Sequence, residues 1–261
     1  MNRYHKAGIW LCLLMVIAIM ISQRNVSPNF SFPKCEIDTP AEMSITFYVD
    51  ADIKRKSELK GKLTKAIQLS NEILGNSCVS LTRKIEEIQY IEISRDLESA
   101  ASLHKELETI VGKDEIAVLR GSPLHQYVLI LNENHSFTAN EEIYGITMMN
   151  INDSFVILDE NFPLVVLEHE LGHLGWAMHD RKESDDAEFW ISEQVFPENR
   201  YKVKPYAGGF FCSGYGTVMT YSEKIIPAYS SPEITNNGEA CGKEGFADNA
   251  RVMREYALSL R

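Results

Sequence analysis

One short stretch, residues 167–180 with the sequence LEHELGHLGWAMHD, constrains the structure of this chain more than any other. Residues four apart lie on the same face of a helix, so a helix through this stretch points His169 and His173 the same way. Gly175 can end that helix, because glycine adopts positive φ without steric cost. The chain can then turn and bring His179 back to the pair. The stretch therefore predicts three imidazoles gathered at the end of a helix.

Three imidazoles in this arrangement predict a particular metal chemistry. Neutral imidazoles bind Zn²⁺ and leave its fourth position open. The bound ion lowers the pKa of water to about 7 and polarises a carbonyl group. Glu170 lies beside the histidine pair, where it can take the proton of this water and pass it to a leaving amine. We therefore expect His169, His173 and His179 to bind Zn²⁺ and Glu170 to act in peptide hydrolysis.

The spacing of these residues resembles the motif H-E-x-x-H-x-x-G-x-x-H of the metzincin metallopeptidases. Asp180, directly after the last histidine, is similar to the aspartate of the reprolysin-like (adamalysin-type) branch. Residues 216–222, GTVMTYS, resemble the family's Met-turn, which would place Met219 beneath the zinc ion. Tyr221 is similar to a tyrosine that approaches the zinc or stabilises the oxyanion in some metzincins; the alternative is a packed core tyrosine. The resemblance covers roughly residues 161–257.

One position departs from that motif. The family's glycine stands three residues before the last histidine, where this chain has Trp176, and Gly175 comes one residue earlier. Either the helix ends one residue early and the loop gains a residue, or Trp176 takes the left-handed conformation at a cost of roughly 1–2 kcal/mol. His179 keeps its spacing in both cases, so we expect it to remain a ligand.

The resemblance implies a zinc-dependent endopeptidase that cleaves extracytoplasmic proteins in a cleft between two subdomains. An edge strand near residues 145–149 would form the upper rim of the cleft, to which an extended peptide could add by main-chain hydrogen bonds. Two alternatives remain open. One is a catalytically inactive metzincin-like domain that binds a partner. The other is a gluzincin-type peptidase in which Glu193 supplies the third ligand instead of His179.

The order of apolar segments predicts an α/β (α+β) fold. Together with the resemblance, it predicts an upper subdomain in residues 43–175, a mixed twisted sheet with helices that includes the zinc helix. Residues 176–261 are expected to form an irregular lower subdomain that carries the Met-turn and ends in a helix. The expected strands lie at residues 45–49, 79–93, 127–131, 145–149 and 155–158, and the expected helices at 55–75, 97–111 and 248–260.

The N-terminal residues 1–27 predict export. Basic residues precede an uncharged apolar run at residues 7–22, which is shorter than the ~20 residues of a spanning helix and suits a secretory signal. A clear small-residue cleavage pattern is absent, so residues 1–27 are either a signal peptide or an uncleaved signal anchor that tethers the protein to a membrane. Residues 28–42 are rich in proline and are expected to be an extended linker. We therefore expect a secreted or periplasmic protein.

Four cysteines follow the N-terminal segment, an even number that suggests two disulfides in an oxidising compartment. Three connectivities can be drawn. We favour Cys35–Cys78 and Cys212–Cys241, because each pair lies within one half of the chain. The alternatives are buried free thiols and, for Cys35, a faint resemblance to the cysteine switch of matrixins, in which a propeptide thiolate occupies the fourth zinc position.

The formal net charge of the chain is −11. A body this acidic repels phosphate backbones, so nucleic acid is not expected as a partner. The expected partner is a protein or peptide substrate, and the chain is expected to be a monomer.

Overall fold

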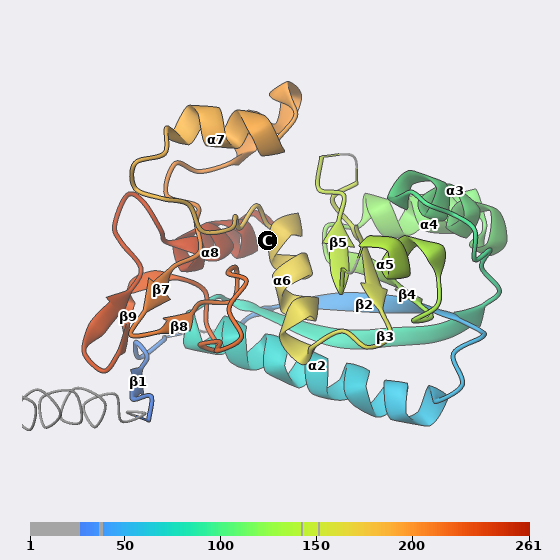
Figure 1. Cartoon of the computed structure of the whole chain (residues 1–261), viewed down its shortest axis with the longest axis horizontal. Coiled ribbons are helices and arrows are strands. Elements are labelled where there is room, and N and C mark those ends of the chain that lie inside the picture. Colours follow the sequence, from blue (N-terminus) through green and yellow to red (C-terminus); the bar gives the residue numbers. More distant parts are fainter. Residues whose placement is uncertain (1–26, 37–38, 142, 151) are drawn as a thin grey trace, which may run out of the picture.

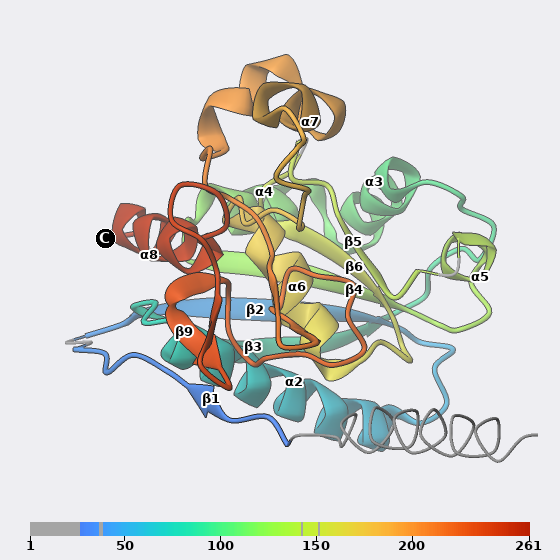
Figure 2. The ribbon, with the colours of Figure 1, turned by 60° about the vertical axis from the view of Figure 1, so that its left-hand side comes forward.

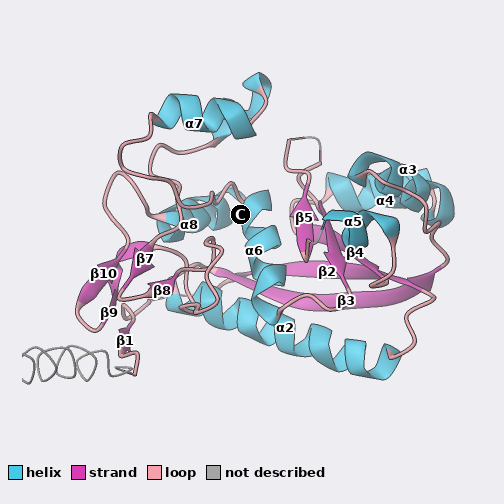
Figure 3. Cartoon of the chain, in the orientation of Figure 1, coloured by secondary structure: helices cyan, strands magenta, loops and turns pink. Residues whose placement is uncertain are grey.

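A computed structural model describes residues 27–261 of this 261-residue chain, except residues 37–38, 142 and 151. The predicted tether at residues 7–22 therefore lies outside the described residues. Among the described helices, none is both long enough and apolar enough to cross a membrane. The described residues form a central sheet with helices on both faces, followed by a less regular portion (Figures 1 and 3).

The central sheet has five strands, in the order β3 (Leu81–Ile91), β2 (Ala41–Asp50), β4 (His125–Leu131), β6 (Phe155–Asp159) and β5 (Gly145–Thr147). The first four are parallel, and β5 pairs antiparallel with β6 at the edge. β4 and β6 are apolar and almost wholly buried, as strands of a parallel sheet covered on both faces are. The expected α/β fold with a mixed sheet is confirmed, and every expected strand is present.

Helices cover both faces of this sheet. α2 (Lys56–Asn76) and α6 (Leu164–Leu174) pack on one face and form a common core with the apolar side chains of β2, β4 and β6. α3 (Ala100–Val111) and α4 (Lys113–Gly121) pack on the other face. The sequence pattern predicts α2 and α3 but not α4, because Ile116 is the only fully buried residue of that helix and leaves no apolar periodicity.

The portion after α6 holds short elements. In chain order they are α7 (Ala187–Gln194), the 3-10 helix η1 (Pro197–Lys202), β7 (Phe211–Cys212), β8 (Tyr215–Gly216), β9 (Ser231–Asn236), β10 (Glu239–Cys241) and α8 (Asn249–Ser259). β7 pairs with β8, and β9 pairs with β10. The expected C-terminal helix is confirmed as α8. This portion also contains α7, which the sequence pattern does not predict because the helix fully buries none of its side chains and shows no apolar stripe.

Both expected disulfides are present, Cys35–Cys78 and Cys212–Cys241. Cys35 is therefore not a free thiol, and its interpretation as a cysteine switch is wrong. The first disulfide joins the segment before β2 to the residues that follow α2. A short strand in the same segment, β1 (Phe30–Ser31), pairs antiparallel with β9. The residues expected to form a linker are thus attached to the folded part at two points.

Candidate metal centre

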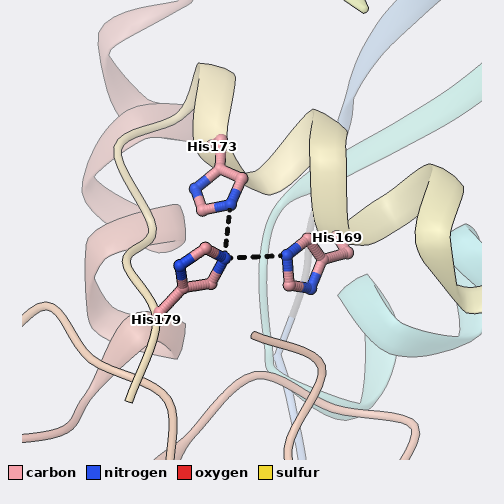
Figure 4. A group of neighbouring side chains, drawn as sticks. All are labelled: His169, His173 and His179. Carbon is pink, nitrogen blue, oxygen red and sulfur yellow. Dashed lines mark hydrogen bonds between the residues drawn. The ribbon is translucent and has the colours of Figure 1, made fainter. Parts of the chain in front are cut away.

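His169 and His173 project from α6, and the chain after the helix brings His179 to them (Figure 4). The Nε2 atom of His179 lies 3.0 Å from that of His169 and 2.9 Å from that of His173. His169 and His173 are each only 8% exposed. The three rings offer nitrogen atoms that lie within 4.8 Å of one another, close enough to hold a single metal ion.

Backbone carbonyl groups orient two of the three rings. His169 Nδ1 donates to the carbonyl oxygen of Val218 at 2.8 Å, and His173 Nδ1 donates to that of Ala177 at 2.9 Å. Because a carbonyl oxygen only accepts, each Nδ1 carries a hydrogen and each neutral ring presents a lone pair on Nε2. His179 Nε2 carries at most one hydrogen and cannot donate to both. The donor set therefore fits a cation, and the orienting carbonyls are those that metal-binding histidines commonly have.

Burial keeps the three imidazoles neutral. It lowers the pKa of His169, lowers the pKa of His173 well below its ordinary value, and lowers the pKa of His179 to about 4. The neighbouring histidines add to the effect on His173 and His179, because protonated rings this close would repel each other. Neutral imidazole is the form that binds a metal.

The turn that ends α6 explains how His179 reaches the pair. Trp176 has φ 67° and takes the left-handed conformation, whereas Gly175 has φ −91°. Trp176 N–H donates to the carbonyl of His173, and Ala177 N–H donates to that of Gly172. These two bonds are the pattern of a Schellman cap. Of the two arrangements considered for the departure from the motif, the left-handed tryptophan is the one present.

Glu170 follows His169 on α6 and lines the same cavity as the histidines. Thr147 of β5 donates a hydrogen bond from Oγ1 to Glu170 Oε2 at 2.7 Å. Burial raises the pKa of Glu170 to about 7, and the hydrogen bond from Thr147 opposes this rise. A carboxyl group with this pKa can both accept and return a proton near neutral pH. Sequence reasoning misses Thr147, because only the pairing of the edge strand places it beside the helix.

Met219 is fully buried beneath α6, in the turn at residues 217–220. An added Cβ on Gly172 would lie 3.0 Å from Met219 Sδ, so this turn packs directly against the helix beside the histidines. The preceding residue, Val218, supplies the carbonyl group that orients His169. The structure therefore places the residues that resemble a Met-turn next to the three rings.

The hydroxyl group of Tyr221 lies 3.0 Å from Nε2 of His179. The Tyr221 side chain is 79% exposed, so its interpretation as a packed core tyrosine is wrong. Glu193, the ligand of the gluzincin alternative, is exposed on α7. Among the described residues, the group that could hold a metal contains the three histidines and not Glu193.

A buried ion pair lies next to the candidate metal site. Arg83 of β3 donates from Nε to Glu168 Oε2 at 2.7 Å and from Nη2 to Glu168 Oε1 at 3.1 Å, and neither side chain is exposed. Arg83 Nη1 also donates to Gln126 Oε1 at 2.9 Å, and the Tyr229 hydroxyl donates to Glu168 Oε1 at 2.6 Å. Glu168 directly precedes His169 on α6. The network therefore fixes how α6 is rotated about its axis relative to the sheet. Sequence reasoning misses it, since its members lie in four separate segments.

A cavity of about 880 Å³ adjoins the three histidines. Its walls come from β5 and the turn after it, from α6, and from residues 218–225. Most of the lining is apolar and includes Ile146, Met149, Val165, Val166, Val218 and Ile225. An apolar cavity with a few converging polar groups is the usual form of a ligand site.

Comparison with known proteins bears on the fold alone. No protein-family model matches the chain, and no curated protein matches its sequence. The structure is similar to a chain in a structure of a chaperone–substrate complex, with a TM-score of 0.62 and 14% identity. The match covers 85% of this chain but 35% of the other, so this chain spans about a third of that one.

Two further structures give weaker matches. Metalloproteinase-II from Bacteroides fragilis has a TM-score of 0.47 and 16% identity, over 90% of this chain and 59% of the other. Archaemetzincin from Methanopyrus kandleri has a TM-score of 0.30 and 13% identity, over 62% of this chain and 84% of the other. Similarities this weak do not indicate a shared function.

Proposed function

We propose that this protein is a zinc-dependent peptidase of the metzincin type that hydrolyses peptide bonds of extracytoplasmic proteins. One observation carries the proposal. The Nε2 atoms of His169, His173 and His179 converge in a cavity that also holds the Glu170 carboxyl group. Because Nδ1 of His169 and of His173 donates to a backbone carbonyl, Nε2 of each ring keeps a free lone pair, as a zinc ligand requires.

The residues of the chain have separate tasks in this reaction. Zn²⁺, when bound, supplies a Lewis acid that acidifies water and polarises the scissile carbonyl group. Glu170 accepts the proton of the attacking water and returns it to the leaving amine, for which its pKa of about 7 is suitable. Thr147 holds one oxygen of that carboxyl group in place. The Tyr221 hydroxyl, beside His179, would donate to the developing oxyanion.

The compartment forms part of the proposal. Two disulfides are typical of proteins in an oxidising compartment such as the periplasm or the extracellular space. They support a protein that works outside the cytoplasm, where other exported proteins are its substrates. We further propose that residues 7–22 direct export and, if they are not removed, tether the enzyme to the membrane.

The test combines metal content with proteolysis of the full-length protein. Metal is measured by mass spectrometry and cleavage with unfolded casein, for the unmodified protein, Glu170→Gln, and the control Glu72→Gln on the exposed face of α2. We expect about one zinc per chain in all three. Cleavage should fall by about 10²–10⁴-fold in Glu170→Gln alone. Zinc without cleavage of any peptide would contradict the peptidase and favour a metal-binding domain that docks a partner. Absence of zinc would contradict the whole proposal.

The third ligand has its own pair of variants. His179→Ala should abolish zinc binding, whereas Glu193→Ala should leave it unchanged, because Glu193 is exposed and lies outside the group of potential ligands. The opposite result would establish the gluzincin-type arrangement.

A further inference from the structure

The cavity beside the histidines lies between α6 and the edge strand β5, which run side by side in the same direction. Gly145 at the start of β5 lies against Val166 and Glu170 of α6. Thr147 at the end of β5 bonds to Glu170, and the next residues approach the end of the helix. The cavity is therefore a groove with two ends: one near Gly145, and one where both elements finish.

The end where both elements finish is bridged by Asn150. Its Nδ2 donates to the carbonyl of Gln194 at 2.9 Å, and its Oδ1 accepts from the backbone N–H of Phe196 at 3.0 Å. Its own carbonyl accepts from Asn199 Nδ2 at 3.0 Å. Three hydrogen bonds thus tie the turn after β5 to α7 and η1, across the groove. Asn150 and Gln194 also line the cavity, so the bridge forms its wall.

Apolar packing reinforces this bridge. Met149, next to Asn150, packs on a buried cluster that includes Trp176, from the turn after α6, and Val195, from the end of α7. Arg200 of η1 donates to the carbonyls of Val195 and Ser192, at 3.1 and 3.2 Å, and so holds the chain after α7 in place. In Figures 1 and 2, α7 lies beyond the same ends of α6 and β5. The ends of both walls therefore meet one packed cluster.

The opposite end of the groove is open. Tyr144, just before β5, is 53% exposed, and Glu223 on the other wall is exposed as well. Among the described residues, no hydrogen bond joins residues 143–145 to residues 221–225. A chain that enters here meets no comparable bridge before it reaches the histidines.

We propose that the groove is blind at the Asn150 end, so that the substrate does not pass through it. This inference rests on the proposed function and names its substrate class: polypeptides whose cleaved bond lies within a few residues of one chain end. An extended chain advances about 3.3 Å per residue, so each further residue on the blind side needs space that the bridge and its cluster fill. On the open side the substrate continues into solvent and can be of any length.

The test uses two series of peptides built around one cleaved sequence. In one series glycine and serine residues extend the N-terminal side, and in the other they extend the C-terminal side; mass spectrometry locates the cut. We expect kcat/KM to fall by at least about tenfold with extension on one side and to stay constant on the other. Equal tolerance of long extensions on both sides would overturn the inference.

Asn150→Ala tests the wall itself. It removes both side-chain bonds of the bridge, so the ratio of kcat/KM between long and short peptides of the restricted series should rise towards one. The matched control is Asn161→Ala, whose side chain bonds to Glu133 at an exposed site. Asn161→Ala should show the same ratio of kcat/KM between long and short peptides as the unmodified protein. Persistence of the full restriction in a folded Asn150→Ala protein would show that Asn150 does not form the wall.

Binding separates failure of this inference from failure of the proposed function. Fluorescently labelled peptides of both series are titrated into Glu170→Gln, which should bind without cleaving. A restriction on one side in binding, without cleavage by the unmodified protein, would uphold the blind groove and contradict the peptidase. Cleavage, with equal tolerance of extensions on both sides in both assays, would support the peptidase and contradict the blind groove.

Discussion

Gly175 at the end of α6 lies directly against Met253 of α8: an added Cβ on the glycine would lie 2.7 Å from Met253 Sδ and 3.0 Å from its Cε. The positive φ of the turn falls on Trp176 instead. The missing side chain of Gly175 therefore permits the contact between two helices, and the tryptophan carries the strain of the turn. Burial of the Trp176 ring in the cluster beside α7 offsets that strain.

Gly175→Ala should lower the free energy of unfolding by about 1 kcal/mol, because the new methyl group must displace the flexible end of the Met253 side chain. Met253→Ala creates a cavity and should itself cost about 2–5 kcal/mol. In the Met253→Ala background, Gly175→Ala should cost clearly less than in the unmodified protein. Denaturant unfolding of the four proteins measures this coupling, and strictly additive effects would contradict the contact.

Gly61→Ala is the matched control for that series. Gly61 lies within α2, and an added Cβ there would meet nothing within 4 Å. Replacing a glycine inside a helix by alanine without a clash should raise stability by about 0.5–1 kcal/mol. A loss of stability at this position would show that the unfolding assay reports something other than local packing.

Breaking the pair between Arg83 and Glu168 should be costly, because it leaves a buried charge without a partner. Arg83→Met or Glu168→Gln alone should lower the free energy of unfolding by about 3–5 kcal/mol. The double variant should lose much less than the sum of the two, since it leaves neither charge buried. Glu183→Gln, which breaks the exposed pair with Lys243, should cost at most about 1 kcal/mol. Equal losses at both sites would contradict the account of Arg83.

Removal of the metal should destabilise the folded protein, because a ligand that binds only the folded state adds to its stability. Zinc at about 1,000 times its dissociation constant contributes about 4 kcal/mol. For a chain of this size, that free energy corresponds to a fall in Tm of roughly 10 °C on chelation. Differential scanning calorimetry with and without a chelator measures it, and added zinc should restore it. His173→Ala should show no response to the chelator; an equal response there would place the metal elsewhere.

The metal-free protein should lose stability in mild acid. Burial lowers the pKa of His179 to about 4 in the folded state, whereas an unfolded histidine titrates near 6.5. The stability linked to His179 is therefore complete above about pH 6.5 and is lost as the pH falls towards 4. Tm of the chelated protein should fall more steeply over this range than Tm of chelated His179→Asn.

Glu170 also contributes to the pH dependence of stability in that experiment. Its pKa of about 7 is raised by burial, so the stability linked to it is present in acid and is lost as the pH rises from about 4.5 to 7. This opposite trend occurs in both proteins, and their difference isolates His179. Parallel Tm curves for the two proteins between pH 6.5 and 4 would contradict the neutral, buried state of His179.

The parts of the fold that the sequence predicts are those whose apolar pattern is local and complete. β4 is recognisable because all but its first residue are buried, and α2 because its buried residues recur at helical spacing. α4 and α7 escape recognition because almost nothing on them is fully buried. Helices of this kind are held by their neighbours along the chain rather than by an apolar stripe of their own.

The candidate site likewise has parts that the sequence predicts and parts that it does not. The meeting of His169, His173 and His179 is predictable, because it depends on one helical repeat and one turn within eleven residues. The partners of these residues are not, since Val218 and Thr147 come from distant segments. The roles of the histidines as zinc ligands, and of Glu170 as a catalyst, stay predictions that the experiments above test.

The sequence by itself predicted the ring cluster, favoured the disulfide pairing that is present and located the strands of the central sheet. Only the tertiary structure showed that Gly175 packs against Met253 of α8 and that Trp176 takes the left-handed turn. It also decided that Asn150 meets α7 across the groove. Both outcomes depend on atoms far apart in the chain, and a linear pattern carries no information about the distance between them.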